Sequence, residues 1–315
     1  MFNTESNIYV AGHTGLLGSA IVKKLKENGY KNIITKTHKE LELTDKLAVN
    51  HFFSENKIEY IFLCAGKVGG IIGNKTNPAL YLHQNLIIQD TIFEMAVKYN
   101  VKNVVFYGSS CTYPKICPQP IKEEYWLTGA IEETSMGYAA AKIAGIIACK
   151  SYNIQYNTNR FICVIPNSMY GPNDNFDLEN SHVFSALIRK FHEAKQRDDK
   201  SITLWGSGTP KREFIFSEDV ADASIFLVKN SNNLENNFYN LGTGVDYSIK
   251  ELAKNIAKIV EFDGEILWDT TKPDGTPRKL LDSSRFLSLG WKPKINFEEG
   301  LKITYNWYKD TYANT

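Results

Sequence analysis

A tyrosine and a lysine four residues apart, Tyr138 and Lys142, carry the most suggestive chemistry in this chain of 315 residues. On a helix, this spacing places both side chains on one face. An ammonium close to a phenol favours the phenolate, so we expect Lys142 to lower the Tyr138 pKa from its usual value of about 10. The pair would then serve as an acid or base near neutral pH. Because Tyr-x-x-x-Lys is common by chance, the motif alone also fits two residues on a helix surface without a catalytic role.

An apolar run that leads into a serine and a cysteine precedes this pair in the chain. Residues 104–107 are Val-Val-Phe-Tyr and pass into Gly-Ser-Ser-Cys-Thr, which predicts a buried strand whose carboxyl end opens into a site. In extended backbone, Ser109 and Cys111 point to the same side. A serine, a tyrosine and a lysine are the groups needed to move a proton on and off a carbonyl oxygen while a hydride moves on carbon. Taken alone, Cys111 also fits a small core hydrophobe.

A glycine-rich turn follows the first apolar run of the chain. A strand at residues 7–11, a turn spaced Gly-x-x-Gly-x-x-Gly and a helix at 19–28 form, in this order, a dinucleotide-binding fingerprint. Gly12 permits the tight turn, Gly15 lets the backbone approach a pyrophosphate, and Gly18 lets helix and strand pack closely. Free N–H groups and the helix dipole favour phosphates at the amino end of the helix. The predicted contacts here are Gly12, Thr14, Gly15, Leu16, Leu17 and Gly18.

The charge after the second predicted strand indicates which dinucleotide binds. An acidic residue there holds the ribose of NAD, whereas a cation accommodates the 2′-phosphate of NADP. Between the strand at 32–35 and Glu40 there is no acidic residue, and Lys36 is the best-placed cation. The sequence therefore favours NADP(H), although a loop lysine can equally be a solvated charge. Further contacts are expected after two later strands, namely Ala65, Gly66 and Lys67 after one and Pro166 and Asn167 after the other.

A long apolar segment at residues 78–100 predicts a helix that begins at a proline. Its apolar residues spread round most of its circumference, which predicts burial on both sides, and a subunit interface would supply the second side. Asn85 is a polar exception within this helix. It is either a hydrogen-bonded core amide or a group that orients Lys142 through water, and we count it with the cofactor site.

The composition is that of an ordinary soluble globular protein, with 43% hydrophobic and 23% charged residues. A net charge of +1 argues against general binding to nucleic acid or to a membrane surface. The five cysteines lack metal-type or disulfide-framework spacing, so we expect no metal site and reduced thiols in a cytoplasmic protein. The first residues lack a basic segment followed by an apolar core, so no signal peptide is expected. No apolar run approaches the roughly 20 residues that cross a bilayer.

Strands and helices alternate regularly up to about residue 172, which predicts an α/β protein with a doubly wound parallel sheet of the Rossmann type. From residue 173 the chain changes to polar loops, an amphipathic helix and scattered aromatic residues. We therefore expect a dinucleotide-binding domain at 1–172, to which 214–245 returns. A smaller carboxyl-terminal α/β domain at 173–213 and 246–315 would bind substrate.

Aromatic and cationic residues lie beside two loops rich in glycine and proline in this second part. Trp205 could stack on a base, and Arg212, Lys272 and Arg278 could neutralise a diphosphate. Each alone also fits an ordinary surface residue, and their clustering around the loops favours a binding role.

Together these segments resemble the GDP-L-fucose synthase family of extended short-chain dehydrogenase/reductases. The similarity covers nearly the whole chain, in segments such as AGHTGLLGSAI, GSSCTYPK, YAAAKIAGI, YGPNDNF and WGSGTPKREF. It implies a Rossmann domain that binds NADPH, a carboxyl-terminal part that binds a GDP-linked 4-keto-6-deoxy sugar, and a homodimer through the helices at 78–100 and 138–156. The implied reaction is reduction of the C4 ketone of the sugar, with epimerisation at C3 and C5.

The resemblance also implies catalytic roles. Tyr138 would protonate the C4 oxygen, Lys142 would hold the nicotinamide ribose, and Ser109 would hydrogen-bond the keto oxygen. Protons at C3 and C5 are acidic because both carbons neighbour the ketone, whose oxygen takes up the charge. Cys111 is implied as the base for these protons and His182 as the acid that returns them. Cys111 must then be partly thiolate, with a pKa below about 8.5; without the resemblance, His182 fits a surface imidazole.

Three positions depart from the family pattern. Thr14 stands where the family has an arginine beside the 2′-phosphate, which leaves Lys36 with less help. Gly137 replaces a proline before the tyrosine. Lys190 occupies an arginine position expected to contact the diphosphate, where it supplies a point charge in place of a fork. The identity of the sugar and the retention of epimerisation therefore stay open.

Three other functions share parts of this sequence pattern. A 4-reductase that acts after a separate epimerase, on a related sugar such as a GDP-4-keto-6-deoxyheptose, would keep the same serine, tyrosine and lysine. A 4,6-dehydratase needs a carboxylic acid beside the serine to protonate the departing hydroxyl, and this chain has Cys111 and Thr112 there. A protein that senses NADP(H) without turnover could lose the Tyr–Lys pair, which is present.

Overall fold

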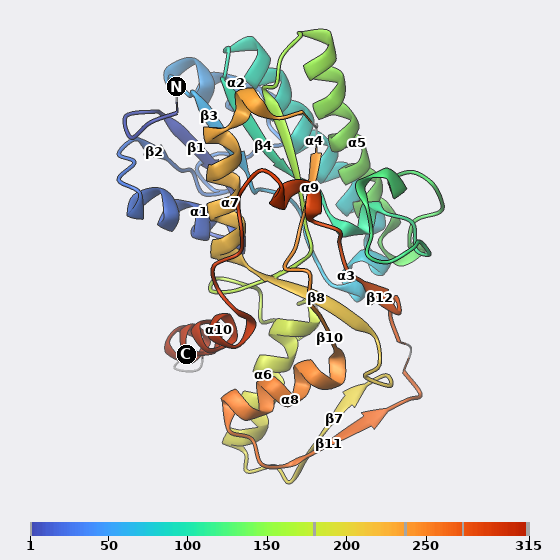
Figure 1. The fold of residues 1–315 in the computed structure, drawn as a ribbon. Coiled ribbons are helices and arrows are strands. Elements are labelled where there is room, and N and C mark those ends of the chain that lie inside the picture. The colour runs from blue at the N-terminus through green and yellow to red at the C-terminus, as the bar shows by residue number, and fades with distance from the viewer. Residues whose placement is uncertain (1, 179–180, 236–237, 273, 313–315) are drawn as a thin grey trace.

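The larger of two lobes contains a six-stranded sheet, which occupies the upper half of Figure 1. The computed structural model describes residues 2–178, 181–235, 238–272 and 274–312. All neighbouring strands of this sheet are parallel, which confirms the predicted Rossmann-type sheet. In spatial order the strands are β2 (Ile33–Ile34), β1 (Ile8–Ala11), β3 (Tyr60–Leu63), β4 (Asn103–Tyr107), β5 (Phe161–Pro166) and β9 (Phe238–Leu241).

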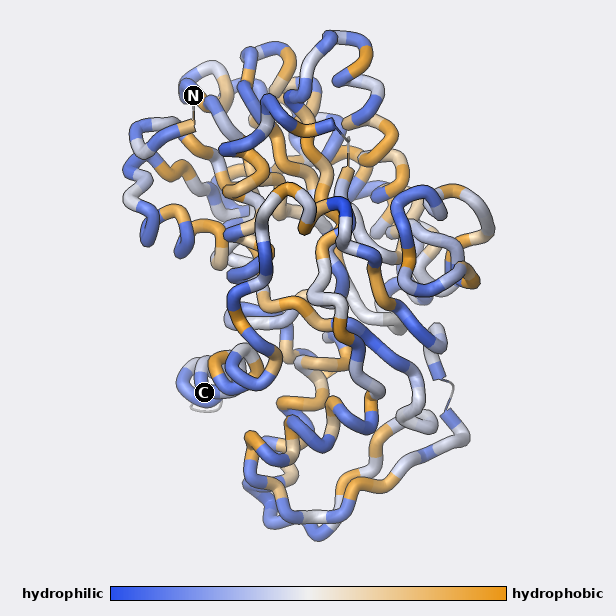
Figure 2. The backbone as a smooth tube through the Cα atoms, viewed as in Figure 1, coloured by the Kyte–Doolittle hydropathy of each residue, from blue (hydrophilic) through white to orange (hydrophobic). Residues whose placement is uncertain are grey.

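Helices cover both faces of this sheet, so its strands are apolar without interruption. On β1, Ile8 and Val10 point into a core shared with α1 (Leu16–Glu27) and α7 (Ser217–Lys229). Tyr9 and Ala11 point to the other face, toward α2 (Lys46–Glu55), α4 (Pro78–Lys98) and α5 (Met136–Gln155). In Figure 2 hydrophobic segments run through the middle of the upper lobe, and others lie in the surrounding helices and in the lower lobe. Among the described helices, including the short α3 (Ile71–Thr76), none has the length and apolar character needed to span a membrane.

The smaller lobe has two small sheets and three longer helices around an aromatic core. One sheet joins β10 (Asp246–Ser248), β8 (Lys211–Phe216), β12 (Arg278–Lys279) and β6 (Ser168–Tyr170), and the other pairs β7 (Ser201–Trp205) with β11 (Glu265–Asp269). The helices are α6 (Val183–Gln196), α8 (Ile249–Val260) and α10 (Phe297–Thr311). Phe184 of α6 and Tyr305 of α10 pack with Phe214 of β8 in one core.

Several helices begin at residues that favour a helix start. Pro78 occupies the first turn of α4, where its missing N–H has no cost. Asp45 caps α2 by accepting hydrogen bonds from Leu47 N and Ala48 N. Ser248 and Glu251 form a capping box at the start of α8. These local signals mark where the helices begin.

The packing bears on the proposed division of the chain into two domains. β9 completes the large sheet and α7 packs beside α1, which supports the proposal that 214–245 returns to the first domain. Phe286 of the short helix α9 (Ser284–Leu287) and Trp291 also lie in that core. We therefore propose that residues 284–291 are counted with the dinucleotide-binding domain.

Candidate active site

The glycine turn after β1 lies against the loop after β3. Gly12 has a φ of 79°, where glycine is favoured, and a Cβ on it would lie 2.7 Å from the backbone nitrogen of Ala65. A Cβ on Gly18 would collide with the carbonyl oxygen of Gly12, so this glycine lets α1 pack against the turn. The two loops meet beyond the carboxyl ends of β1 and β3. The strand order changes direction there, and dinucleotides bind at this place in such sheets.

The amino end of α1 suits a pyrophosphate. Its N-cap residue, Gly15, has no side chain to cap the first N–H groups. A Cβ on Gly15 would meet only the oxygen of Gly12, at 3.6 Å, so the backbone is open to close approach. Thr14 is exposed and Leu16 is half-buried, whereas the Leu17 side chain is buried in the core. The turn can thus offer backbone groups to phosphates, while the side chain of Leu17 serves packing.

Lys36 lies two residues beyond β2, the strand next to β1. Its ammonium is 4.0 Å from the carboxylate of Glu40, and its side chain is 39% exposed. A partly exposed pair at this distance is weak, so Lys36 can still bind an external phosphate. This position fits the predicted contact with the 2′-phosphate of NADP.

Asn85 of α4 fixes the loop after β3. Its amide oxygen accepts a hydrogen bond from Lys67 N at 3.0 Å, and its amide nitrogen donates to Lys67 O at 3.0 Å and Tyr81 O at 2.6 Å. Of the two alternatives for Asn85, the structure therefore supports the hydrogen-bonded amide. A Cβ on Gly66 would lie 3.9 Å from the Lys142 ammonium, so this loop forms one wall of the space in front of Lys142.

β4 and α5 bring three predicted catalytic residues together. Ser109 caps the short 3₁₀ helix at Ser110–Thr112, and its Oγ accepts a hydrogen bond from Cys111 N at 3.2 Å. Tyr138 lies in the first turn of α5 and hydrogen-bonds with Ser109. Lys142, one turn further, is buried, and its ammonium lies 5.8 Å from the centre of the Tyr138 ring. The serine, tyrosine and lysine thus form one cluster at the carboxyl end of β4.

The protonation states in this cluster differ from the expectation. Burial raises the pKa of the Tyr138 phenol well above its usual value, Cys111 raises it further, and the hydrogen bond with Ser109 only partly opposes this. Burial also lowers the pKa of Lys142 to about 8. The prediction that Lys142 lowers the Tyr138 pKa is therefore wrong for this structure, because burial dominates and the ammonium donates to Tyr107 O at 2.8 Å. A phenol that keeps its proton is suited to donate it to a ketone oxygen.

Cys111 lies in an electropositive environment. Burial by itself would raise the pKa of its thiol, but the Lys279 ammonium and hydrogen bonds from Ser109 and Ser135 outweigh burial, and the pKa is lowered. The predicted direction is therefore confirmed. Lys279, whose ammonium is 3.6 Å from the Cys111 sulfur, was missed by the sequence analysis. Its only signal was its place beside Arg278, and successive strand residues face opposite sides, so the sequence alone could not indicate which of the two faces the site.

His182 is the N-cap residue of α6 and is exposed. Burial raises the pKa of nearby Asp174, and His182 partly lowers it. Asp174 in turn accepts a hydrogen bond from the Ser185 hydroxyl. The structure thus places His182 beside an acidic side chain at the start of α6, and none of the contacts found among the described residues joins it to Cys111.

Pro166 ends β5, and Asn167 connects the two lobes. The amide nitrogen of Asn167 donates to Glu213 Oε2 at 2.5 Å and to Lys279 O at 3.3 Å, and its amide oxygen accepts a hydrogen bond from Ser168 N at 3.1 Å. Both polar atoms of this side chain are therefore used within the protein. Asn167 lies at the predicted place, but its side chain hydrogen-bonds to Glu213 and Lys279 of the small lobe.

Trp205 lies at the end of β7 between two cations. Its side chain is 60% exposed, and the ammonium groups of Lys190 and Lys272 lie 5.6 and 5.7 Å from the centre of its ring. An exposed aromatic ring beside ammonium groups can stack on a base and attract a diphosphate. Three of the predicted substrate contacts are thus brought together on one surface.

The two predicted arginines lie in different environments. Parallel pairing of β8 with β12 places Arg212 opposite Lys279 and Arg278 opposite Lys211. Burial lowers the pKa of Arg212, and an electrostatic interaction with Cys111 partly opposes this. The guanidinium donates hydrogen bonds to Lys211 O at 2.7 Å and to Thr276 O at 2.6 Å. Arg278 is 2.5 Å from the carboxylate of Asp246. Arg212 therefore adds positive charge near Cys111, whereas the charge of Arg278 is matched by a carboxylate.

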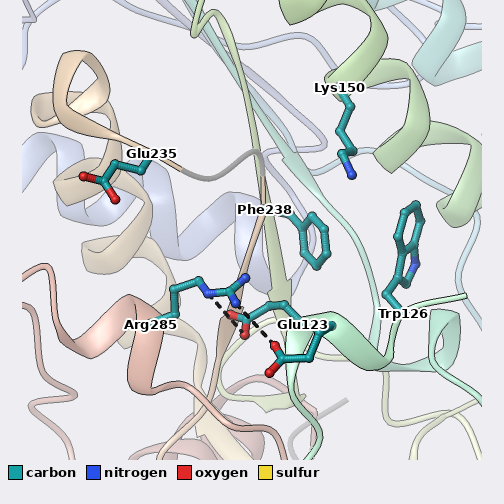
Figure 3. A pocket seen from close by; sticks show the side chains of 7 residues that line it. Glu123, Trp126, Lys150, Glu235, Phe238 and Arg285 are labelled. Atoms are coloured by element: carbon teal, nitrogen blue, oxygen red, sulfur yellow. Dashed lines mark hydrogen bonds and ion pairs between the residues drawn. The ribbon is translucent and has the colours of Figure 1, made fainter. Parts of the chain in front are cut away.

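A cavity of about 320 Å³ lies away from the Ser–Tyr–Lys cluster. It is bordered by α5, by β9 and by the segment that follows β4. In Figure 3 the Lys150 ammonium points toward the rings of Trp126 and Phe238, while Arg285 pairs with Glu123 and Glu124. The lining residues are Glu123, Glu124, Trp126, Lys150, Glu235, Phe238 and Arg285. None of the predicted site residues lines this cavity, so it is distinct from the candidate active site.

The doubly wound parallel sheet, the glycine turn at its switch point and the Ser–Tyr–Lys cluster define a short-chain dehydrogenase/reductase of the extended type. Residues 8–242 match the model of the NAD dependent epimerase/dehydratase family. The chain belongs to this family, and within it to the group that contains the GDP-L-fucose synthases.

Relatives in this group match over the whole chain. GDP-L-fucose synthase 1 of Arabidopsis thaliana is 49% identical over 314 residues, which cover 100% of this chain and 96% of that protein. GDP-L-fucose synthase of Escherichia coli K12 is 45% identical and covers 97% of each chain. Among solved structures, the GDP-mannoheptose C4 reductase of Campylobacter jejuni with NADP bound is 42% identical, with a TM-score of 0.91 over 98% of this chain and 100% of that one.

Proposed function

We propose that this protein uses NADPH to reduce the C4 ketone of a GDP-4-keto-6-deoxy sugar, and that it also epimerises C3 and C5. The observation that carries the proposal is the cluster at the carboxyl end of β4. Ser109 Oγ accepts a hydrogen bond from Cys111 N at 3.2 Å, the Lys142 ammonium lies 5.8 Å from the centre of the Tyr138 ring, and the Tyr138 phenol interacts with Ser109 and Cys111. A proton donor for an oxygen and a base for a neighbouring carbon thus meet at one point. A simple reductase needs only the first of these.

The chain's own residues can perform the oxygen chemistry of the reduction. Bound NADPH would be held by the glycine turn of α1, Lys36, the loop at 65–67 and Lys142, and it would supply the hydride. Tyr138, protonated at neutral pH because burial raises its pKa, donates its proton to the C4 oxygen. Ser109 hydrogen-bonds the same oxygen. Lys142, charged below a pKa of about 8, adds positive charge where the oxygen becomes negative.

Epimerisation needs a base and an acid on opposite faces of the sugar ring. The low pKa of Cys111 supports its role as the base. We propose His182 as the acid, which requires that bound substrate lies between α6 and the end of β4. The sugar nucleotide would place its base on Trp205 and its diphosphate near Lys190, Lys272 and Arg212. This arrangement would span the two lobes.

Incubation of the protein with the keto sugar in deuterated water, without NADPH, separates an epimerase/reductase from a C4 reductase that does not epimerise. Deuterium incorporation at C3 or C5 of the keto sugar requires epimerase activity, and added NADPH should then be oxidised with formation of the 4-hydroxy sugar. Reduction without incorporation would instead identify a C4 reductase that acts after a separate epimerase, on a sugar such as a heptose. The likeness to the Campylobacter jejuni heptose reductase makes this the second candidate. Purified protein should be screened with both hexose and heptose GDP-4-keto sugars.

We also propose a homodimer through α4 and α5. A groove of about 330 Å³ between these helices is lined by Leu86, Ile87, Gln89, Asp90, Phe93, Ala144 and Ala148. On α5, Ile147 is 45% exposed and Ile154 is 77% exposed, and paired helices with exposed apolar side chains suit contact with a second copy. Ile147→Glu should shift the mass in light scattering from dimer to monomer. Leu47→Glu, on the exposed face of α2, should leave it unchanged.

We propose a reducing, cytoplasmic compartment for the protein. All five cysteines are free thiols, as expected where glutathione keeps thiols reduced. The proposed base, Cys111, would lose its function on oxidation, so a reducing compartment also suits the chemistry.

A further inference from the structure

The Lys279 ammonium donates a hydrogen bond to the Cys111 sulfur across a distance of 3.6 Å. The two residues are separated by 168 positions in the chain. Cys111 lies in the 3₁₀ helix after β4 in the large lobe, and Lys279 lies on β12 of the small lobe. The contact therefore forms only when the two lobes are joined.

The backbone around Lys279 is held from several sides. Leu280 N donates to Gln119 Oε1 at 2.9 Å, and Leu280 O accepts a hydrogen bond from Ile121 N at 2.7 Å. The carbonyl of Lys279 itself accepts a hydrogen bond from Asn167 at 3.3 Å. Fixed backbone on both sides limits where the ammonium can reach, so its place beside the sulfur follows from the fold.

Two cations share the face of the small sheet that meets Cys111. The parallel register of β8 and β12 puts Arg212 directly opposite Lys279, and directly opposite residues point to the same side. Like charges placed in this way repel each other, and an anion beside them relieves the repulsion. The Cys111 sulfur lies 3.6 Å from the Lys279 ammonium and also interacts with Arg212, so a thiolate at this position would relieve the repulsion.

The other groups around Cys111 are polar and uncharged. Ser109 and Ser135 hydrogen-bond with the sulfur, and the Tyr138 phenol lies beside it. Glu132 also interacts with Lys279 but has its own partner in Lys115, at 3.1 Å. Lys279 is thus the cation in direct contact with the thiol.

We propose that Lys279 is a positioning residue that holds Cys111 as a thiolate, ready to remove a proton from the carbon next to the C4 ketone. The proposal rests on the proposed epimerase activity. In that step the C–H bond breaks and an S–H bond forms. The electron pair of the C–H bond enters the enolate, whose charge lies on the C4 oxygen. The Lys279–sulfur ion pair is lost in this step and forms again when the proton leaves the sulfur.

Cys117 provides an internal reference. Burial raises the pKa of its thiol, and Lys279 only partly opposes this. Both cysteines therefore interact with the same lysine, but only Cys111 is in hydrogen-bond contact with it. Loss of Lys279 should consequently change the reactivity of Cys111 far more than that of Cys117.

The test is the alkylation of substrate-free protein by iodoacetamide as a function of pH, with the Cys111 and Cys117 peptides followed separately by mass spectrometry. In Lys279→Met, the midpoint for Cys111 should rise by about one pH unit or more, which lowers its rate at neutral pH about tenfold. Lys279→Arg should restore most of the rate. Lys302→Met, which alters an exposed lysine of α10, should match the parent. An unchanged Cys111 midpoint in Lys279→Met would overturn the proposal.

A second measurement separates this role from mere binding of the substrate diphosphate. Deuterium exchange into the keto sugar should lose kcat in Lys279→Met, whereas a lysine that only binds diphosphate would change KM alone. A changed KM with unchanged kcat would overturn the catalytic part of the proposal. If the parent itself shows no exchange, the proposed epimerase function is wrong, and the alkylation profile still decides whether Lys279 ionises Cys111.

Discussion

The Lys142 ammonium lies over the Tyr138 ring, 5.8 Å from its centre, and donates its hydrogen bond to the carbonyl of Tyr107 and not to the phenol. Lys142 is therefore not hydrogen-bonded to the phenol, and burial is the main influence on the protonation of both groups. The tyrosine keeps its proton, and the lysine holds its charge less firmly than it does in water. This division of roles suits reduction, in which the phenol must give a proton to an oxygen.

Removal of the phenolic hydroxyl should stop turnover without affecting the fold. In Tyr138→Phe, the proton for the C4 oxygen is lost while the ring remains, so kcat for NADPH oxidation should fall by about 100-fold or more. NADPH binding, measured by fluorescence, should stay within about twofold, a change of roughly 0.4 kcal/mol. Tyr312→Phe, which alters a 42% exposed tyrosine, is the matched control. Unchanged turnover in Tyr138→Phe would exclude this residue as the acid.

Replacement of the buried lysine should stabilise the protein while inactivating it. Burial lowers the Lys142 pKa from 10.5 to about 8, which corresponds to on the order of 3 kcal/mol against the charged form at neutral pH. Loss of the hydrogen bond to Tyr107 O offsets about 1 kcal/mol of this. Lys142→Met should therefore raise the free energy of unfolding at pH 7 by about 1–2 kcal/mol, measured with urea, and abolish reduction.

The difference in the free energy of unfolding between Lys142→Met and the parent should depend on pH with a definite sign. Between pH values of about 8 and 10.5 the unfolded chain binds the proton of Lys142 more tightly than the folded chain does, so the stability of the parent relative to Lys142→Met rises with pH across this interval. The advantage of the methionine variant should thus be full below pH 8 and shrink above it. An advantage that grows with pH would show that Lys142 is stabilised in its charged form.

The glycine turn and the Ser–Tyr–Lys cluster could be predicted because their signals are local. Gly12, Gly15 and Gly18 follow a strand within a few residues, and Tyr138 and Lys142 are one helical turn apart. The parallel sheet followed from the alternation of apolar runs and helices. In each case, spacing along the chain fixes the spatial relationship.

Features that depend on tertiary packing were beyond the sequence. The Tyr138 pKa could not be predicted because burial of its hydroxyl depends on segments far from α5. Lys279 could not be distinguished from Arg278 because the register of β12 against β8 decides which side chain faces Cys111. Leu17 and Asn167 lie in predicted segments, yet their side chains serve the core and the link between the lobes.

The choice of cofactor should depend on the cation after β2. Lys36→Glu would place a carboxylate where the 2′-phosphate is proposed to bind, so we expect the KM for NADPH to rise by about 10- to 100-fold, as expected for loss of a charge-assisted hydrogen bond. The KM for NADH should change little. Lys26→Glu, on the exposed end of α1, is the control for net charge. An equal change for both cofactors would argue against a role of Lys36 at the 2′-phosphate.

A buried carboxylate, Glu213, should prove essential to the joint between the lobes. Glu213 is fully buried on β8 and accepts hydrogen bonds from Gly244 N at 2.7 Å, Leu281 N at 3.0 Å and the side chain of Asn167. Both oxygens are used, so the glutamine in Glu213→Gln would have to turn an NH₂ group toward a donor. Such a mismatch costs about 1–3 kcal/mol of the free energy of unfolding. Because the same carboxylate anchors the segment that carries Lys279, the variant should also lower the rate of Cys111 alkylation at neutral pH. Glu265→Gln, at an exposed site on β11, should change neither the free energy of unfolding nor the rate of Cys111 alkylation. A Glu213→Gln variant with unchanged stability and normal Cys111 reactivity would show that the contact between the lobes does not depend on this carboxylate.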